Sequence, residues 1–259
     1  MGIEKLNRKD EVDLIVLLAG EGRRLRPLTN DRPKGLLNCN DGTTIFSHLI
    51  RAVADYNWNV NVIPVIGHCW SKVHEEINSM TSLVNFNCVN NPFYATAGPL
   101  VSLWLGVMQA KSERVIIANG DTLIRSSLVK EIVPWMYDKG IQSESEIGIC
   151  VSHTDEFEED DMKILLDEKG VFKEAGKEIV PRTGVLKSAG VICLRNDSSK
   201  NDFRNKLDGL LMNEAFLKKN YHWHKLLNVL SESFYVDLIR VDKNSWHEVD
   251  TIVDLKSMA

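Results

Sequence analysis

The chain has 259 residues, of which 44% are hydrophobic, enough to form one large core, and we expect a single domain over residues 1–259. The formal net charge is −5, so no overall positive field would attract nucleic acid or an anionic membrane. No apolar run approaches the roughly 20 residues that a membrane-spanning helix needs. The five cysteines are scattered without a CxxC pair, which indicates free thiols in a reducing compartment. We therefore predict a cytoplasmic protein with no nucleic-acid partner and no membrane insertion.

The first half of the chain alternates short apolar runs with amphipathic stretches. After a charged extension at 1–12, the run DLIVLLA (13–19) is typical of a strand buried on both faces. Further strands are predicted at 61–67, 82–91 and 114–121, and helices at 43–58, 70–80 and 99–110. The first helix follows a threonine pair that can cap it. This order predicts a doubly wound, mostly parallel, Rossmann-like α/β sheet.

The second half has a different rhythm. Strand-like runs at 146–153, 162–179 and 187–194 are joined by polar turns, and Asp167 to Gly170 is predicted to be a hairpin tip. Helices at 201–219 and 224–233, a strand at 234–242 and a helix after residue 250 follow. We expect antiparallel additions at the sheet edge, with about 146–194 and 201–234 forming a small lobe that covers a ligand site.

A cationic loop follows the first predicted strand. The segment LLAGEGRRLRPLTNDRPKGLL (17–37) has glycines that let backbone N–H groups approach an anion. Its spacing is not that of a P-loop, and Leu25 stands where a dinucleotide-binding GxGxxG has its third small residue. Because ligands of an open parallel sheet bind at the carboxyl ends of its strands, we expect Arg24 and Lys34 to fold over a triphosphate there.

The loop resembles the AGxGxRLxPLTxxxPKxLL motif of the nucleotidyltransferases that join a nucleoside triphosphate to a sugar 1-phosphate or to phosphocholine and release pyrophosphate. The resemblance implies that Arg24 and Lys34 are catalytic and neutralise the phosphates. It also implies a set of nucleotide-binding residues: Leu18, Ala19, Gly20, Glu21, Gly22, Arg23, Gly67, Tyr94, Asn119 and Gly120.

Two later segments carry candidate metal ligands. Asp121 ends the predicted strand of IIANGDTL (116–123), and Asp250 lies in SWHEVDTIVDL (245–255). Taken singly, Asp121 could form a turn and Asp250 could cap a helix. Together they resemble the family's NGD and ExDT segments, whose two aspartates hold Mg²⁺, the expected cofactor.

Candidate acceptor-binding residues lie in the second half. Lys177 in EAGKEI resembles the family lysine that binds the acceptor's phosphate, although a solvated hairpin lysine would look the same. Lys163 in DDMKIL is a second candidate, for which a solvated position is the simpler interpretation. We also expect Gly190, Glu248 and Trp223 on the acceptor side. A quaternary ammonium group would favour aromatic neighbours, and those available are Tyr94, Trp104, Tyr221, Trp223 and Trp246, with Trp104 interpreted as a core residue.

The acceptor class depends on which branch of the family the chain resembles. NNPFYATAGPLVSLW (90–104) and WHEVDT are more similar to the phosphocholine cytidylyltransferase branch than to hexose-phosphate enzymes, but Gly98 and Pro99 stand where that branch has Asn-Asn. The leading hypothesis is transfer from CTP to a small phosphorylated alcohol or amine, or to a phosphonate. The alternatives are a sugar 1-phosphate with UTP, dTTP or GTP, and a non-catalytic nucleotide-binding regulatory module. The sequence leaves the oligomeric state open, a homo-oligomer included.

Overall fold

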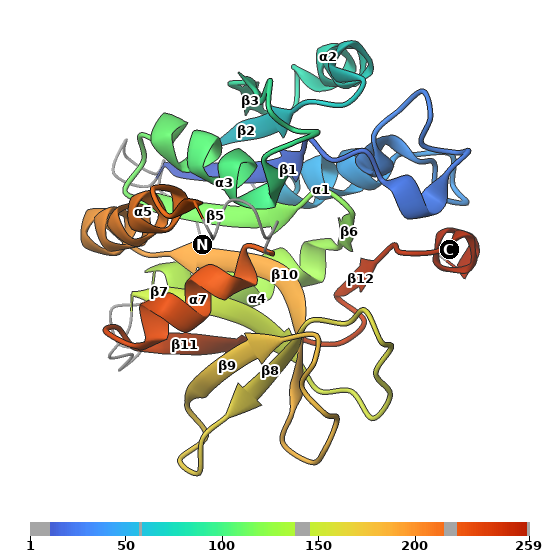
Figure 1. Ribbon diagram of the computed structural model, residues 1–259. Coiled ribbons are helices and arrows are strands. Elements are labelled where there is room, and N and C mark those ends of the chain that lie inside the picture. The colour runs from blue at the N-terminus through green and yellow to red at the C-terminus, as the bar shows by residue number, and fades with distance from the viewer. Residues whose placement is uncertain (1–10, 57–58, 138–145, 215–221, 258–259) are drawn as a thin grey trace, which may run out of the picture.

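The computed structural model describes residues 11–56, 59–137, 146–214 and 222–257. In these ranges the chain folds as a mixed α/β structure around one large twisted sheet, with helices on both faces (Figure 1). Almost all of the extension expected at 1–12, the end of the helix expected at 201–219 and Tyr221 lie outside the described residues. Within those residues, none of the helices combines the length and apolarity needed to cross a bilayer.

Parallel strands form the half of the sheet that the sequence predicts best. They are β1 (Val12–Leu18), β2 (Val60–Ile66), β3 (Asn85–Phe86), β4 (Val89–Asn90) and β5 (Arg114–Asn119). β1 lies between β2 and β5, and β3 and β4 both pair with β2. The single strand expected at 82–91 is therefore wrong in detail. An edge segment has a neighbour on one side only. Its strand pairing can therefore be interrupted at 87–88 without leaving another strand unpaired.

Two layers of helices cover the sheet. One face packs against α1 (Ile45–Ala54), α2 (Trp70–Met80) and α4 (Ser126–Tyr137), and the other against α3 (Gly98–Gln109), α5 (Asp197–Leu211) and α7 (His224–Ser231). Thr44 caps α1 as expected, because its side chain accepts a hydrogen bond from the Ser47 amide. These layers hold β1 and β5 in a core that is apolar on both sides.

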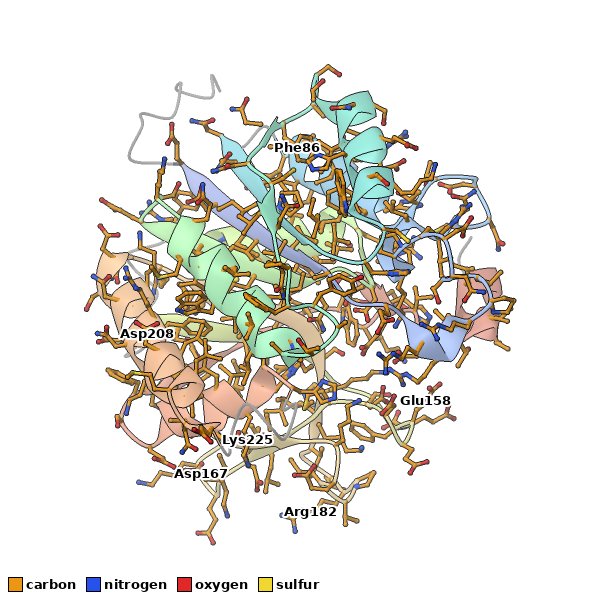
Figure 2. The ribbon with its side chains drawn as sticks, turned by 45° about the horizontal axis from the view of Figure 1, so that its top comes forward. Phe86, Glu158, Asp167, Arg182, Asp208 and Lys225 are labelled. Carbon is orange, nitrogen blue, oxygen red and sulfur yellow. The ribbon has the colours of Figure 1, made fainter. Side chains whose placement is uncertain are left out.

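The antiparallel additions are confirmed, but their strands β10 and β7 lie inside the sheet and not at its edge. β10 (Leu186–Leu194) pairs antiparallel with β5 and with β7 (Ile147–Ser152), and β11 (Val236–Arg240) then pairs parallel with β7. The hairpin of β8 (Lys163–Leu166) and β9 (Phe172–Gly176) branches from β10. Figure 2 shows Asp167 at the predicted tip of this hairpin and Glu158 in the loop that leads into it.

A separate ribbon connects the middle of the chain to its end. β6 (Thr122–Ile124) pairs antiparallel with β12 (Trp246–Glu248), which α8 (Ile252–Ser257) follows. The ribbon leaves the sheet directly after β5. Strand order reverses at β1, so the crevice expected at such a switch point opens between the carboxyl ends of β1 and β5, next to the ribbon.

Candidate active site

The loop after β1 is fixed by its own backbone and by Thr29. Gly22 has a left-handed backbone (φ 58°) and begins a short 3-10 helix, Arg23–Leu25. The buried Thr29 hydroxyl donates to the Gly22 carbonyl at 2.8 Å. Arg23 and Arg26 both pair with Glu21, whereas Arg24 turns toward the crevice. Both Arg23 and Arg24 therefore border the site, but Arg23 is paired with a carboxylate of the loop itself.

Lys34 links the loop to both candidate metal ligands. Its Nζ lies 2.9 Å from Asp121 Oδ2 and 2.9 Å from Asp250 Oδ1, and its side chain is 12% exposed. Burial opposes the charge, but the two carboxylates outweigh it and raise the pKa of Lys34. Arg24 also reaches Asp250, with Nη2 3.0 Å from Oδ1. The structure therefore brings all four residues that carry the sequence hypothesis into one cluster.

The β6–β12 ribbon explains how Asp121 and Asp250 meet. Thr122 is opposite Glu248 in the ribbon, and the Val249 amide donates to the Asp121 carbonyl. The cap of the helix after the ribbon is Thr251, whose hydroxyl oxygen accepts from the Asp254 amide, and the Asp254 carboxylate in turn accepts from the amides of Asp250 and Thr251. The helix-cap interpretation of Asp250 is therefore wrong, and its carboxylate faces the crevice.

Three carboxylates converge at the end of the ribbon. One oxygen from each of Asp121, Glu248 and Asp250 lies within 4.8 Å of the others. Asp121 Oδ1 is buried and has no hydrogen-bond partner in the described part of the chain. Burial, reinforced by the two aspartates, raises the pKa of Glu248 to about 8. A buried oxygen without a partner and an all-oxygen donor set fit a hard divalent cation such as Mg²⁺.

Lys177 lies across the crevice from the cationic loop. Its Nζ is 2.7 Å from Asp160 Oδ1, and Arg24 contacts the other oxygen of Asp160. The Lys177 side chain is 27% exposed and lines the crevice, so it is a partly solvated lysine in an ion pair and not a fully solvated one. Asp160 is a crevice residue that the sequence interpretation missed.

A cavity of about 410 Å³ joins these groups, within the range of small-molecule sites. The predicted residues that line it are Ala19, Gly20, Glu21, Gly22, Arg23, Arg24, Tyr94, Asn119, Gly120, Asp121, Lys177, Gly190, Trp223 and Glu248. A second cavity of about 280 Å³ adds Leu18, Lys34 and Asp250. Gly67 lines neither cavity. It packs under the Tyr94 side chain, where an added Cβ would come within 2.6 Å.

Some expectations for single residues fail. Trp104 is partly buried against the core, close to its interpretation as a core residue, and donates to Asp208, while Trp246 is buried away from both cavities. The solvated interpretation of Lys163 is wrong, because that residue is only 3% exposed. The alternation of polar and apolar residues in a hairpin does not show which of its charged side chains a neighbouring loop covers.

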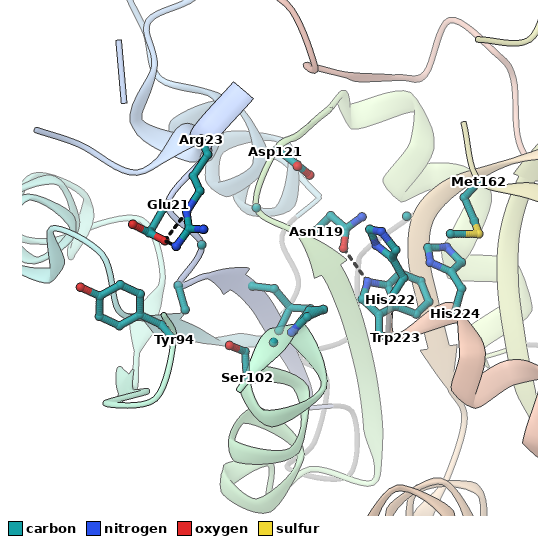
Figure 3. A pocket seen from close by; sticks show the side chains of 18 of the residues that line it. Glu21, Arg23, Tyr94, Ser102, Asn119, Asp121, Met162, His222, Trp223 and His224 are labelled. Atoms are coloured by element: carbon teal, nitrogen blue, oxygen red, sulfur yellow. Dashed lines mark hydrogen bonds and ion pairs between the residues drawn. The ribbon is translucent and has the colours of Figure 1, made fainter. Parts of the chain in front are cut away.

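Trp223 connects the two sides of the cavity. Its indole N–H donates to Asn119 Oδ1 at 2.7 Å, and its ring stacks on His224 with centroids 3.5 Å apart. Figure 3 shows Asn119 between Asp121 and this stacked pair, with Tyr94 on the opposite wall. Other lining residues that sequence reasoning missed are Ser102, Met162, Ser188, His222 and His224. Ser102 lies in the segment 90–104 and the two histidines flank Trp223, but only the fold shows that they line the cavity.

Comparison with known proteins identifies the family. The model of the MobA-like NTP transferase domain matches residues 14–159, more than half of the chain. The chain belongs to this family, which places it among the nucleotidyltransferases. The bifunctional protein GlmU of Methanocaldococcus jannaschii is 25% identical over 146 residues. That match covers 54% of this chain and 33% of GlmU, so the matched part spans about a third of this relative.

Solved structures share the fold over nearly the whole chain. The inositol-1-phosphate CTP transferase from T. maritima has a TM-score of 0.74 at 20% identity, covering 95% of this chain and 91% of that one. CTP:phosphocholine cytidylyltransferase from Streptococcus pneumoniae has a TM-score of 0.70 at 16% identity, covering 94% and 95%. A Bacillus anthracis chain assigned as a glucose-1-phosphate thymidylyltransferase has a TM-score of 0.73 at 14% identity, covering 94% and 92%. Identities this low establish a common fold and no substrate.

Proposed function

We propose that this protein is a Mg²⁺-dependent cytidylyltransferase that condenses CTP with a small phosphorylated alcohol or amine, or with a phosphonate, and releases pyrophosphate. The observation that carries the proposal is the cluster of Arg24, Lys34, Asp121 and Asp250 at the switch point of a nucleotidyltransferase fold. It combines cations for a triphosphate with carboxylates for a metal ion. Family membership supports the reaction class.

The charge of each side chain indicates its role in the reaction. Lys34 and Arg24 lie where they can neutralise the triphosphate, and the open space around Gly20 leaves room for phosphate oxygens. Asp121 and Asp250, with Glu248 beside them, would hold Mg²⁺. When bound, that ion reduces the repulsion between the attacking phosphate and the α-phosphate. The acceptor phosphate is already ionised, so no general base is needed. The rate enhancement then comes from positioning the two phosphates and from stabilising their charge.

The acceptor side supports a small, partly cationic substrate. Lys177 offers an ammonium group to the acceptor's phosphate, while Asp160 and Trp223 offer a carboxylate and an aromatic surface to a positively charged end. Two of the three structural neighbours above are described as CTP-dependent enzymes with small acceptors. The thymidylyltransferase assignment of the third keeps a sugar 1-phosphate with UTP, dTTP or GTP as the second candidate.

The test is pyrophosphate release with each of CTP, UTP, GTP, ATP and dTTP. Each is offered with phosphocholine, 2-aminoethylphosphonate, inositol 1-phosphate and a panel of sugar 1-phosphates, in Mg²⁺ and in EDTA. We expect release with CTP and a small acceptor in Mg²⁺ only. Release only with a sugar 1-phosphate would establish the second candidate, and none with any pair would favour a non-catalytic module.

Two variants calibrate that assay. Asp121→Asn removes one candidate ligand at nearly constant volume and should lower turnover by at least about a hundredfold. Asp167→Asn makes the same change at the exposed hairpin tip, away from the cavity, and should leave turnover unchanged. Undiminished turnover in Asp121→Asn would remove that residue from the site.

A further inference from the structure

A buried lysine outside the catalytic cluster forms an unusual set of contacts. The Nζ of Lys163 donates to three backbone carbonyls: Lys177 at 2.7 Å, Asp161 at 3.2 Å and Glu159 at 3.5 Å. Only 3% of the residue is exposed, and it makes no ion pair with any carboxylate of the described residues. Burying a long, charged side chain is costly unless its donors are satisfied, and here the backbone alone satisfies them.

The three carbonyls surround one ion pair of the cavity. Glu159 and Asp161 flank Asp160 in the chain, and Lys177 is the residue with which Asp160 pairs. A single ammonium group therefore holds both segments that carry the Asp160–Lys177 contact. Lys163 itself is opposite Gly176 in the β8–β9 ladder, so its side chain spans from the start of β8 to the residue after β9.

A second contact holds the same loop from the other side. The buried carboxylate of Asp161 pairs with Lys187 of β10 and accepts from the Glu158 amide at 2.8 Å. Figure 2 shows Glu158 in this loop, beside the base of the hairpin. The loop is thus tied to β10 through Asp161 and to β9 through Lys163. Asp160 and Met162, on either side of Asp161 in the chain, line the cavity.

We infer that Lys163 is a positioning residue for the acceptor: by fixing the backbone on both sides of the Asp160–Lys177 pair, it holds the Lys177 ammonium where the acceptor's phosphate arrives. Lys163 does not line the cavity and touches no substrate. The inference rests on the proposed function for the identity of the ligand, but the placement of the two segments depends only on the contacts above. Charge-assisted bonds of this kind are about twice as strong as neutral ones.

The variant Lys163→Met keeps the length of the side chain and removes its donors. We expect the acceptor's KM to rise at least about tenfold while the KM of CTP changes less than twofold, because Arg24 contacts Asp160 but keeps its own pair with Asp250, whereas Lys177 loses its fixed position. In a Lys177→Ala background the same substitution should change the acceptor's KM less than twofold, since Lys163 acts through Lys177. An undiminished effect in that background would overturn the inference.

Hydrogen exchange gives a readout that does not need activity. Amides of residues 156–162 and 176–178 should exchange at least about tenfold faster in Lys163→Met than in the native protein. The matched control is Lys200→Met, which removes a lysine that donates to the Ser112 carbonyl and pairs with Asp197 far from the cavity. It should leave these segments unchanged. Unaltered exchange in Lys163→Met would refute the inference, whereas absent turnover in the native protein would refute only the proposed function.

Discussion

Lys34 stabilises the carboxylate cluster as long as no metal ion does so, which makes Lys34→Met an informative perturbation. Its two ion pairs are each 2.9 Å long, and the side chains of Lys34, Asp121 and Asp250 are 12%, 29% and 14% exposed. Removing one partner of a buried ion pair costs about 3–5 kcal/mol, because the other charge remains. Since Asp121 keeps some contact with water, we expect the lower end, about 3 kcal/mol.

The assay is thermal unfolding followed by circular dichroism. For a chain of this size 1 kcal/mol corresponds to roughly 2–4 °C, so Tm in EDTA should fall by about 6–12 °C. Mg²⁺ should then raise the Tm of Lys34→Met more than that of the native protein, because no ammonium group competes for Asp121 and Asp250. A ligand at a hundred times its Kd stabilises by about 2.7 kcal/mol, enough to recover most of the loss.

The control for this prediction is Lys72→Met. Lys72 pairs with Glu75 on the surface of α2, where both side chains are more than half exposed, and its loss should cost no more than about 0.5 kcal/mol. If Lys34→Met melted at the native temperature in EDTA, or if Mg²⁺ stabilised both proteins equally, the ion pairs of Lys34 with Asp121 and Asp250 would not stabilise the cluster.

Three further substitutions test other parts of the structure. In Gly67→Ala the new methyl group would lie 2.6 Å from the Tyr94 side chain, so the ring must move. The KM of the nucleotide should therefore rise about tenfold in steady-state assays. The control Gly209→Ala, whose new methyl group would have nothing within 4 Å, should leave this KM unchanged. Trp223→Phe leaves the Asn119 carbonyl oxygen without its donor and should lower the free energy of unfolding by about 1–3 kcal/mol in urea titrations; a loss below about 0.5 kcal/mol would mean that water replaces the indole. Burial, followed by the charges of His222 and Lys177, holds the pKa of His224 well below 6.5. The unfolded chain therefore takes up this proton first as pH falls below about 6.5, so His224 alone contributes a loss of up to about 1.4 kcal/mol of stability per pH unit toward pH 5, against an opposite contribution from Glu248, which the native protein already holds protonated there. That part of the slope should vanish in His224→Gln, and an equal slope in both proteins would contradict the assignment.

Local features of the fold were predictable because neighbouring residues decide them. Continuous apolar runs indicate strands buried on both faces, and Thr44 begins α1 because its side chain bonds the Ser47 amide three residues on. A glycine-rich turn after a strand is weak evidence by itself, and the anion-binding prediction for the loop around Gly22 depended on the cations Arg24 and Lys34 that follow it. Resemblance to a known motif then supplied candidate roles for Arg24 and Lys34.

Contacts between distant segments of the site could be predicted only through the family resemblance, because no local pattern shows them. Lys34 is separated by 87 residues from Asp121 and by 216 from Asp250. The ribbon of β6 and β12 that joins them has no local signature, because each strand is three residues long. The same ribbon places Glu248 beside both aspartates, and its raised pKa follows from that proximity.

The sequence by itself determined the class of sheet, the glycine-rich cationic loop and the residue types that a nucleotidyltransferase needs, because each depends on a short stretch of chain. Only the tertiary structure decided that β10 lies inside the sheet, that Asp160 enters the cavity and that Lys163 is buried beneath it. Burial and pairing register arise from packing between elements. A charged residue at a hairpin therefore looks the same in the sequence whether it ends in water or under a neighbouring loop.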